Sequence, residues 1–249
     1  MGAFIITFLI ILLIVIFFGV FIYIVFIDRF LTRKKERNKR IAKLNLEEDF
    51  IKKHMTNNTK IINAKINKVD EYFSGQEFLL WVRYVYNKIQ EAYNQRDISV
   101  LKNLEGNVLL EEHSKDIQEY INKKIINVRK EININYTELY KYSLEEDIES
   151  VTVAIRSIMI NYDITDETGE IVKGNVNEYK KYRYYMTFSR KLGNKTSNSF
   201  NMIKNDSCLN CGAKVKSTSI SKCEYCGSTL INNKYDKWIL TNMQRIDLK

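Results

Sequence analysis

The chain places all four of its cysteines in one short segment, CLNCGAKVKSTSISKCEYCG. The segment holds two CxxC pairs separated by eleven residues, and a glycine follows each pair. Glycine easily adopts the left-handed conformation that closes a tight metal-binding turn. Two such turns facing each other would supply four thiolates in the tetrahedral arrangement of a structural zinc site. The predicted ligands are Cys208, Cys211, Cys223 and Cys226.

Paired CxxC motifs are also compatible with thiol redox chemistry and with an iron–sulfur cluster. A redox CxxC usually occurs singly and near a βαβ pattern, which this sequence lacks. An iron–sulfur cluster also uses four cysteines, so the ligand types alone do not separate it from zinc. We favour one structural Zn²⁺ per chain. A site closed by four protein ligands has no open coordination position, so it should stabilise the segment and not catalyse a reaction.

The N-terminal residues 3–27 form an uncharged apolar run. At about 1.5 Å per residue, a helix of this length exceeds the roughly 30 Å thickness of the bilayer hydrocarbon core. A cleaved signal peptide would instead have a basic start, a shorter apolar region and small residues at a cleavage site. The sequence therefore predicts a transmembrane anchor in residues 1–27.

A basic cluster follows the predicted anchor and accounts for most of the charge of the chain. Residues 28–43 carry a net charge of +6 out of the total of +9. By the positive-inside rule, the N-terminus should lie outside and the C-terminal domain in the cytoplasm, where thiols stay reduced. The cluster also suits anionic lipid headgroups. The side chains expected to contact these headgroups are Arg33, Lys34, Lys35, Arg37, Lys39 and Arg40.

The elements that must position the cysteines begin after a connector, which together with the basic segment spans residues 28–65. Ser74 and Glu77 form a capping box, and Phe73 and Phe78 stand at the positions of a hydrophobic staple, so a long helix should begin here. Its core-facing residues recur at helical spacing. They are Phe78, Val82, Val85, Ile89 and Ala92.

Two more helices are predicted before the pattern changes to strands. One covers residues 98–113, with Asp97 as its N-cap, and the other covers residues 115–126. The first should face the core with a set of four apolar side chains, which are Leu101, Leu104, Val108 and Leu109.

From residue 131 onward the sequence has the period of β-strands. Strand patterns occupy residues 131–140, 148–163 and 179–191, and a last strand begins at Trp238. Helices followed by antiparallel strands indicate an α+β domain over residues 66–249. The cysteine segment, a predicted zinc ribbon at 205–230, would then be inserted between the last two strands.

The order of these features resembles the bacterial Tim-44-like domain family. The resemblance is carried by VDEYFSGQEFLLWVRYVYNKIQEAYNQRDISVLKN, by MINYDITDETGEIVKG, by a tyrosine-rich strand ending in FSRK, and by the CxxCG pair followed by KWIL. Family members often have Asp-Pro where this chain has Asp70 and Glu71. These proteins are similar to the matrix-side subunit of the mitochondrial inner-membrane protein translocase. The resemblance implies a cone-like fold of three helices on a curved antiparallel sheet, of the nuclear-transport-factor-2-like class, and a scaffolding or tethering role.

Two non-enzymatic functions fit these features. The first is a membrane-anchored cytoplasmic scaffold that binds a protein partner at the inner face of the membrane. The second is a tether for a ribosome or RNA, supported by the charge of +4 on residues 208–249 and by Tyr225, which could stack on a base. Residues 44–207 sum to −1, so a sustained phosphate-binding surface is missing and the scaffold is favoured.

A third possibility is an enzymatic or small-molecule-binding cone fold. The chain has only two histidines, His54 in the connector and His113, which should be a solvated helix end. The carboxylates from Glu145 to Glu149 should lie in a solvated turn. Neither a phosphate-binding glycine loop nor a Ser/His/Asp arrangement is present in the sequence, so an enzyme is not expected.

Overall fold

The computed structural model describes residues 16–36, 38–39, 42, 58–196, 225, 235 and 237–246. The chain divides into two compact units, Met1–Met55 and Thr56–Lys249.

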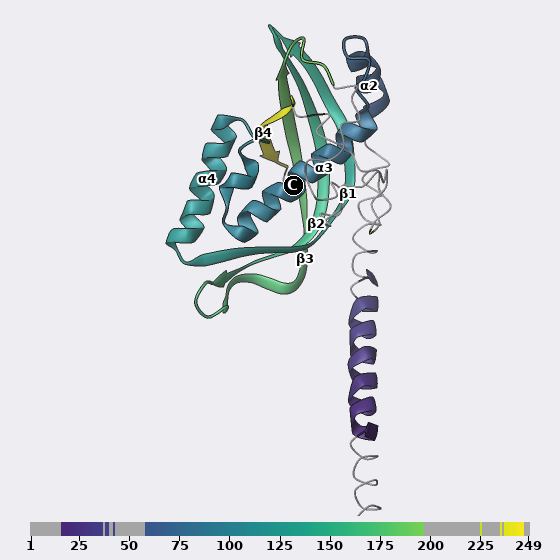
Figure 1. Cartoon of the computed structure of the whole chain (residues 1–249), viewed down its shortest axis with the longest axis vertical. Coiled ribbons are helices and arrows are strands. Elements are labelled where there is room, and N and C mark those ends of the chain that lie inside the picture. Colours follow the sequence, from purple (N-terminus) through teal and green to yellow (C-terminus); the bar gives the residue numbers. More distant parts are fainter. Residues whose placement is uncertain are drawn as a thin grey trace, which may run out of the picture. The chain divides into compact units, whose positions relative to one another are not determined.

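In the first unit, residues 16–36 form a helix with exposed apolar side chains, drawn in purple in Figure 1. Arg33, Lys34 and Lys35 lie on this helix, whereas Arg37 and Arg40 lie outside the described residues. Within the part of the chain that is described, no helix is long and apolar enough to cross a membrane. Residues 1–15 of the predicted anchor lie outside the described residues.

The second unit is an α+β domain, as the sequence predicts. Its helices pack on an antiparallel sheet whose strands follow the order β1-β2-β3-β4. Its elements are α2 (Thr59–Asn67), α3 (Gly75–Gln95), the 3-10 turn η1 (Ile98–Leu101), α4 (Asn107–Asn122), β1 (Ile125–Glu145), β2 (Ile148–Thr165), β3 (Ile171–Lys191) and β4 (Ile239–Arg245).

The start of α3 follows its local signals. The Ser74 hydroxyl accepts a hydrogen bond from the backbone N–H of Glu77 at 3.4 Å. The rings of Phe73 and Phe78 lie 5.3 Å apart between centroids, as a hydrophobic staple requires. The five side chains predicted to face the core are all buried. The capping signals and the helical periodicity therefore predict the start and the buried face of α3 correctly.

The boundaries predicted for the next two helices are wrong. Asp97 does cap a turn, because its carboxylate accepts from the N–H of Ser99 at 2.8 Å, but only η1 follows it. The chain then pairs with β4: the N–H of Leu240 donates to the carbonyl of Leu104, and the N–H of Gly106 donates to the carbonyl of Leu240. This pairing delays the helix to α4, and Val108, expected inside, is 73% exposed.

The long strands bend across the helices (Figure 1). The pairing of β1 with β2 shifts register at three places, and such irregularities increase the local bend and twist of a sheet. β1 begins at Ile125, earlier than predicted, so the end of the third predicted helix belongs to this strand.

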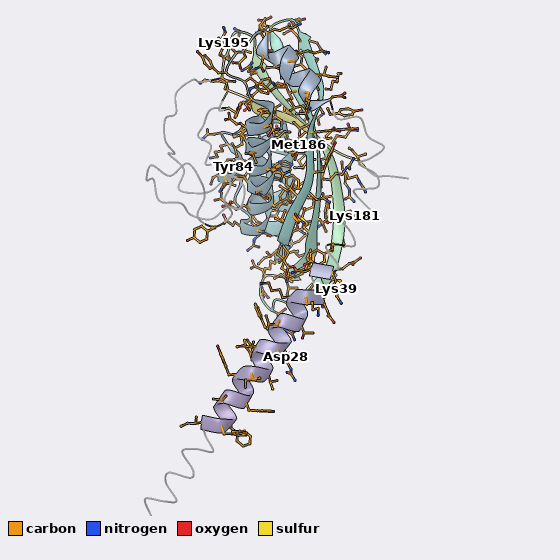
Figure 2. All side chains as sticks on the ribbon, turned by 90° about the vertical axis from the view of Figure 1, so that its right-hand side faces the viewer. Asp28, Lys39, Tyr84, Lys181, Met186 and Lys195 are labelled. Carbon is orange, nitrogen blue, oxygen red and sulfur yellow. The ribbon has the colours of Figure 1, made fainter. Side chains whose placement is uncertain are left out.

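The core lies between α3 and the inner face of the sheet. On β3, alternate side chains point into it, and Met186 and Phe188 are fully buried. Lys181, on the same strand, lies on the side away from α3 (Figure 2). The predicted alternation of residues 179–191 is confirmed. α2 begins within the predicted connector and runs past its end at residue 65, and it buries Ile62 and Ile66 in the same core.

Candidate functional site

The four predicted zinc ligands lie outside the described residues. Among the residues that are described, no group of His, Cys, Asp and Glu side chains could hold a metal ion. On either side of the cysteine segment, the described residues include Thr196 before it and Tyr235 and Trp238 after it. We call the contacts around these three residues the insertion base.

The residue before the insertion is fixed by a buried carboxylate. Asp70 Oδ2 accepts from the N–H of Thr196 at 2.9 Å and from its hydroxyl at 2.6 Å. The same oxygen accepts from Arg190 at 2.7 Å. Burial alone would raise the pKa of Asp70, but the hydrogen bonds from Thr196 and Arg190 outweigh burial and hold the pKa below its ordinary value. Asp70 therefore binds Thr196 as an ionised group.

Arg190 joins Asp70 to a second carboxylate. Its Nε donates to Glu149 at 2.7 Å, and all three side chains of this ion triad are almost fully buried. The Tyr142 hydroxyl donates to Glu149 at 2.8 Å, and burial together with this bond raises the pKa of Tyr142 to about 12. The prediction that Glu149 lies in a solvated turn is wrong, because β2 pairs it directly with Arg190 on β3.

The residues after the insertion return to the same place. The Tyr235 hydroxyl donates to the carbonyl of Ser74 at 3.0 Å and accepts from its N–H at 3.3 Å. The Trp238 ring lies 4.3 Å from the guanidinium carbon of Arg190 and 5.5 Å from the Phe78 ring. Thr196 and Tyr235 therefore both bond to residues 70–74, which lead into α3.

His113 has a structural contact. Its Nδ1 lies 2.9 Å from the buried carboxylate of Glu105, and its side chain is 12% exposed. The solvated helix end predicted for it is therefore wrong. Glu105 forms the bridge to Leu240 of β4, so His113 ties α4 to that bridge. His54 lies outside the described residues.

A cavity of about 330 Å³ lies near the C-terminal end of α3. No motif in the sequence indicates it. Strands β1 to β4 all contribute to its lining, together with Gln90 of α3 and Tyr120 of α4. We call it the polar pocket. Its cationic residues are Arg129, Lys173, Lys180 and Arg245, and Asp163 is the one carboxylate among its described lining residues.

An irregularity in the sheet opens this pocket. β3 pairs Tyr179 with Ile160 and Gly174 with Tyr162, so residues 175–178 stand outside the regular ladder. Gly174 has φ +87°, and a Cβ atom there would lie 2.9 Å from the carbonyl oxygen of Asn161. Only glycine fits this close approach without strain.

Hydrogen bonds fix the wall of the pocket formed by β1 and β2. The Asn127 amide donates to Asn161 at 2.8 Å and to Asp163 at 2.5 Å. Arg129 donates to Asn127 at 2.5 Å and to Gln90 at 2.8 Å. Its guanidinium also lies 3.7 Å from the centroid of the Tyr93 ring. The wall is preorganised, and Asp163 is already hydrogen-bonded within it.

The rest of the lining is rich in tyrosine. Tyr182 and Tyr184 have nearly parallel rings with centroids 6.5 Å apart. Burial raises the pKa of Tyr120 and of Tyr182, so both hydroxyls stay neutral at physiological pH. Cations, neutral hydroxyls and amides thus face one cavity, a combination suited to binding an anion. One feature of the sequence could have indicated this pocket. Lys180 is a charged residue at an inward-facing position of the alternating strand, where an apolar residue is expected.

Comparison with known proteins adds a family match. A family model described as the Tim44-like domain matches residues 60–204. No curated protein matches the chain. Among solved structures 36 chains match, including the crystal structure of the intermembrane space region of the chloroplast protein ARC6. That structure is 8% identical over 66% of this chain and 93% of its own, with a TM-score of 0.34.

Proposed function

The chain belongs to the Tim44-like domain family, and we propose that it is a membrane-anchored scaffold. Its cytoplasmic domain would bind a protein partner at the inner face of the membrane. Residues 1–27 would span the bilayer with the N-terminus outside, and the basic residues from Arg33 to Arg40 would contact anionic headgroups. The domain would have the cone-like shape of the nuclear-transport-factor-2-like class that the family resemblance implies.

The zinc ribbon at 205–230 is part of this proposal, with Cys208, Cys211, Cys223 and Cys226 binding one structural Zn²⁺. The single observation that supports a scaffold most strongly is the insertion base. Thr196 is hydrogen-bonded to Asp70 in the turn between α2 and α3, and Tyr235 is hydrogen-bonded to Ser74, the N-cap of α3. A segment held at both ends by buried contacts loses less conformational entropy when it binds a partner. The insertion is therefore our candidate for the surface that a partner recognises.

A pull-down tests this function. Tagged full-length protein is recovered from detergent-solubilised membranes, with and without nuclease. We expect a defined set of proteins that survives nuclease and is lost from the variant Cys208→Ser/Cys211→Ser. A matched variant, Ser217→Ala/Ser219→Ala, changes the same segment without touching the predicted ligands and should keep the partners. Partners that bind both variants equally would contradict a role for the insertion.

A second candidate function, a ribosome or RNA tether, has one observation in its favour. Tyr225 is 73% exposed, as a stacking residue would need to be. Under this alternative, ribosomal proteins would co-purify with the chain and disappear after nuclease treatment. Their binding would also weaken steeply with salt, because phosphate contacts release counterions.

A further inference from the structure

We propose that the polar pocket binds a small organic phosphate, a phosphate monoester carried on a ring. This inference goes beyond the scaffold function and does not depend on it. It rests on the placement of the pocket's cations, on its tyrosines and on its size, none of which involves the cysteine insertion.

Lys173 and Lys180 both line the polar pocket, although their spacing in the sequence does not predict it. Seven residues apart on a regular strand, they would point to opposite faces of the sheet and lie roughly 23 Å from each other. The irregularity at residues 175–178 changes this. Lys173 pairs with Asp163 and Lys180 pairs with Met159, and these two partners are four residues apart on β2. Both lysines therefore line the same pocket, about 13 Å apart along the sheet.

Among the described residues, neither the Lys173 side chain nor the Lys180 side chain forms an ion pair or a hydrogen bond. Arg245 approaches from β4, with its guanidinium carbon 5.4 Å from the centroid of the Tyr182 ring. Arg129 adds a fourth positive charge from β1. Asp163, the one carboxylate that the described part of the chain contributes to the lining, already accepts a hydrogen bond from Asn127. The excess of positive charge favours a ligand with two negative charges, as a phosphate monoester has near neutral pH.

The size and the tyrosines describe the rest of the ligand. A cavity of about 330 Å³ is at the small end of ligand-binding pockets, so it suits a ligand of one ring and one phosphate. The Tyr182 and Tyr184 rings offer flat apolar surface beside the cations. A ring on the ligand would pack against them while the phosphate meets Lys173, Lys180 and Arg245.

The test is calorimetric titration of the full-length protein in detergent with phenyl phosphate. We expect a Kd of about 1 mM or lower, and weaker binding of glycerol 2-phosphate, which carries the same phosphate without a ring. The variant Lys173→Gln/Lys180→Gln should lose roughly tenfold or more in affinity, because charge-assisted hydrogen bonds are lost. Lys141→Gln, at an exposed lysine of β1 outside the pocket, should bind as the unmodified chain does.

Two results would overturn the proposal: no detectable binding of phenyl phosphate, or equal binding by the double variant and the unmodified chain. If the double variant melts at a lower temperature, Lys173→Gln alone repeats the test, since Lys173 is exposed. Vesicles containing phosphatidylinositol phosphate identify the source of the ligand. Displacement of phenyl phosphate by these vesicles would support a lipid headgroup, and persistence of binding would support a soluble phosphate ester.

Discussion

The two ends of α3 meet the same sheet in opposite ways. This helix has 21 residues and is therefore about 30 Å long. At its start, aromatic rings and a buried ion triad fill the space against β3 and β4. Near its end, Gln90 faces a cavity lined by polar and charged groups. Side chains therefore pack tightly at the insertion base, whereas the polar pocket keeps an unfilled space.

The largest effect should come from breaking the ion triad. In Arg190→Met, the carboxylates of Asp70 and Glu149 would stay buried without their shared cation, which should cost about 3–5 kcal/mol in the free energy of unfolding. Chemical denaturation of the full-length protein in detergent measures this loss. Lys141→Met is the control at an exposed site, and an equal effect of the two substitutions would contradict the special role of the insertion base.

The next effect concerns the irregularity that opens the polar pocket. Gly174→Ala places a Cβ atom at positive φ and against the backbone of Asn161 and Tyr162. It should cost about 1–3 kcal/mol and also weaken phenyl phosphate binding. Gly169→Ala is the matched control: this residue also has positive φ, but a Cβ atom there meets nothing. If Gly169→Ala reduced phosphate binding as strongly, the link between the irregularity and the pocket would fail.

A smaller effect is expected in acid. The folded-state pKa of Asp70 lies below its ordinary value of 3.8, so its contribution to stability is present above this value. The contribution is lost as the pH falls through the lowered pKa. Thermal unfolding should therefore show a steeper decline below about pH 4 for the unmodified chain than for Asp70→Asn. Parallel declines would show that another group controls acid stability.

The smallest effect should follow from removing the pocket lysines. Lys173→Gln/Lys180→Gln breaks no ion pair within the described residues, so the melting temperature should stay the same while phosphate binding falls. This result would separate ligand binding from stability. A large drop in melting temperature would instead mean that the lysines stabilise the fold.

Local signals predicted the parts of the fold that depend on near neighbours. The cap at Ser74, the staple of Phe73 and Phe78, and the alternation along β3 all involve residues close together in the sequence. Each of these was found where the sequence placed it.

The errors have a common physical cause, which is pairing between distant residues. Leu240 pairs with the chain at Leu104 and Gly106, and this contact delays the start of α4. Glu149 is buried because Arg190, 41 residues away, neutralises it. The polar pocket depends on the register between β2 and β3. The sequence of residues 173–180 alone does not predict this register. Periodicity gives the face of a residue only while its strand stays regular.

The proposed zinc site would stabilise the cysteine segment, while the insertion base would stay folded without the metal. Hydrogen–deuterium exchange of the full-length protein, with and without a zinc chelator, tests this most directly. The account predicts faster exchange in residues 205–230 after chelation, with unchanged protection of α3, β2 and β3. Unchanged exchange in residues 205–230 would contradict the metal site, and loss of protection across the whole domain would contradict the independence of the insertion base.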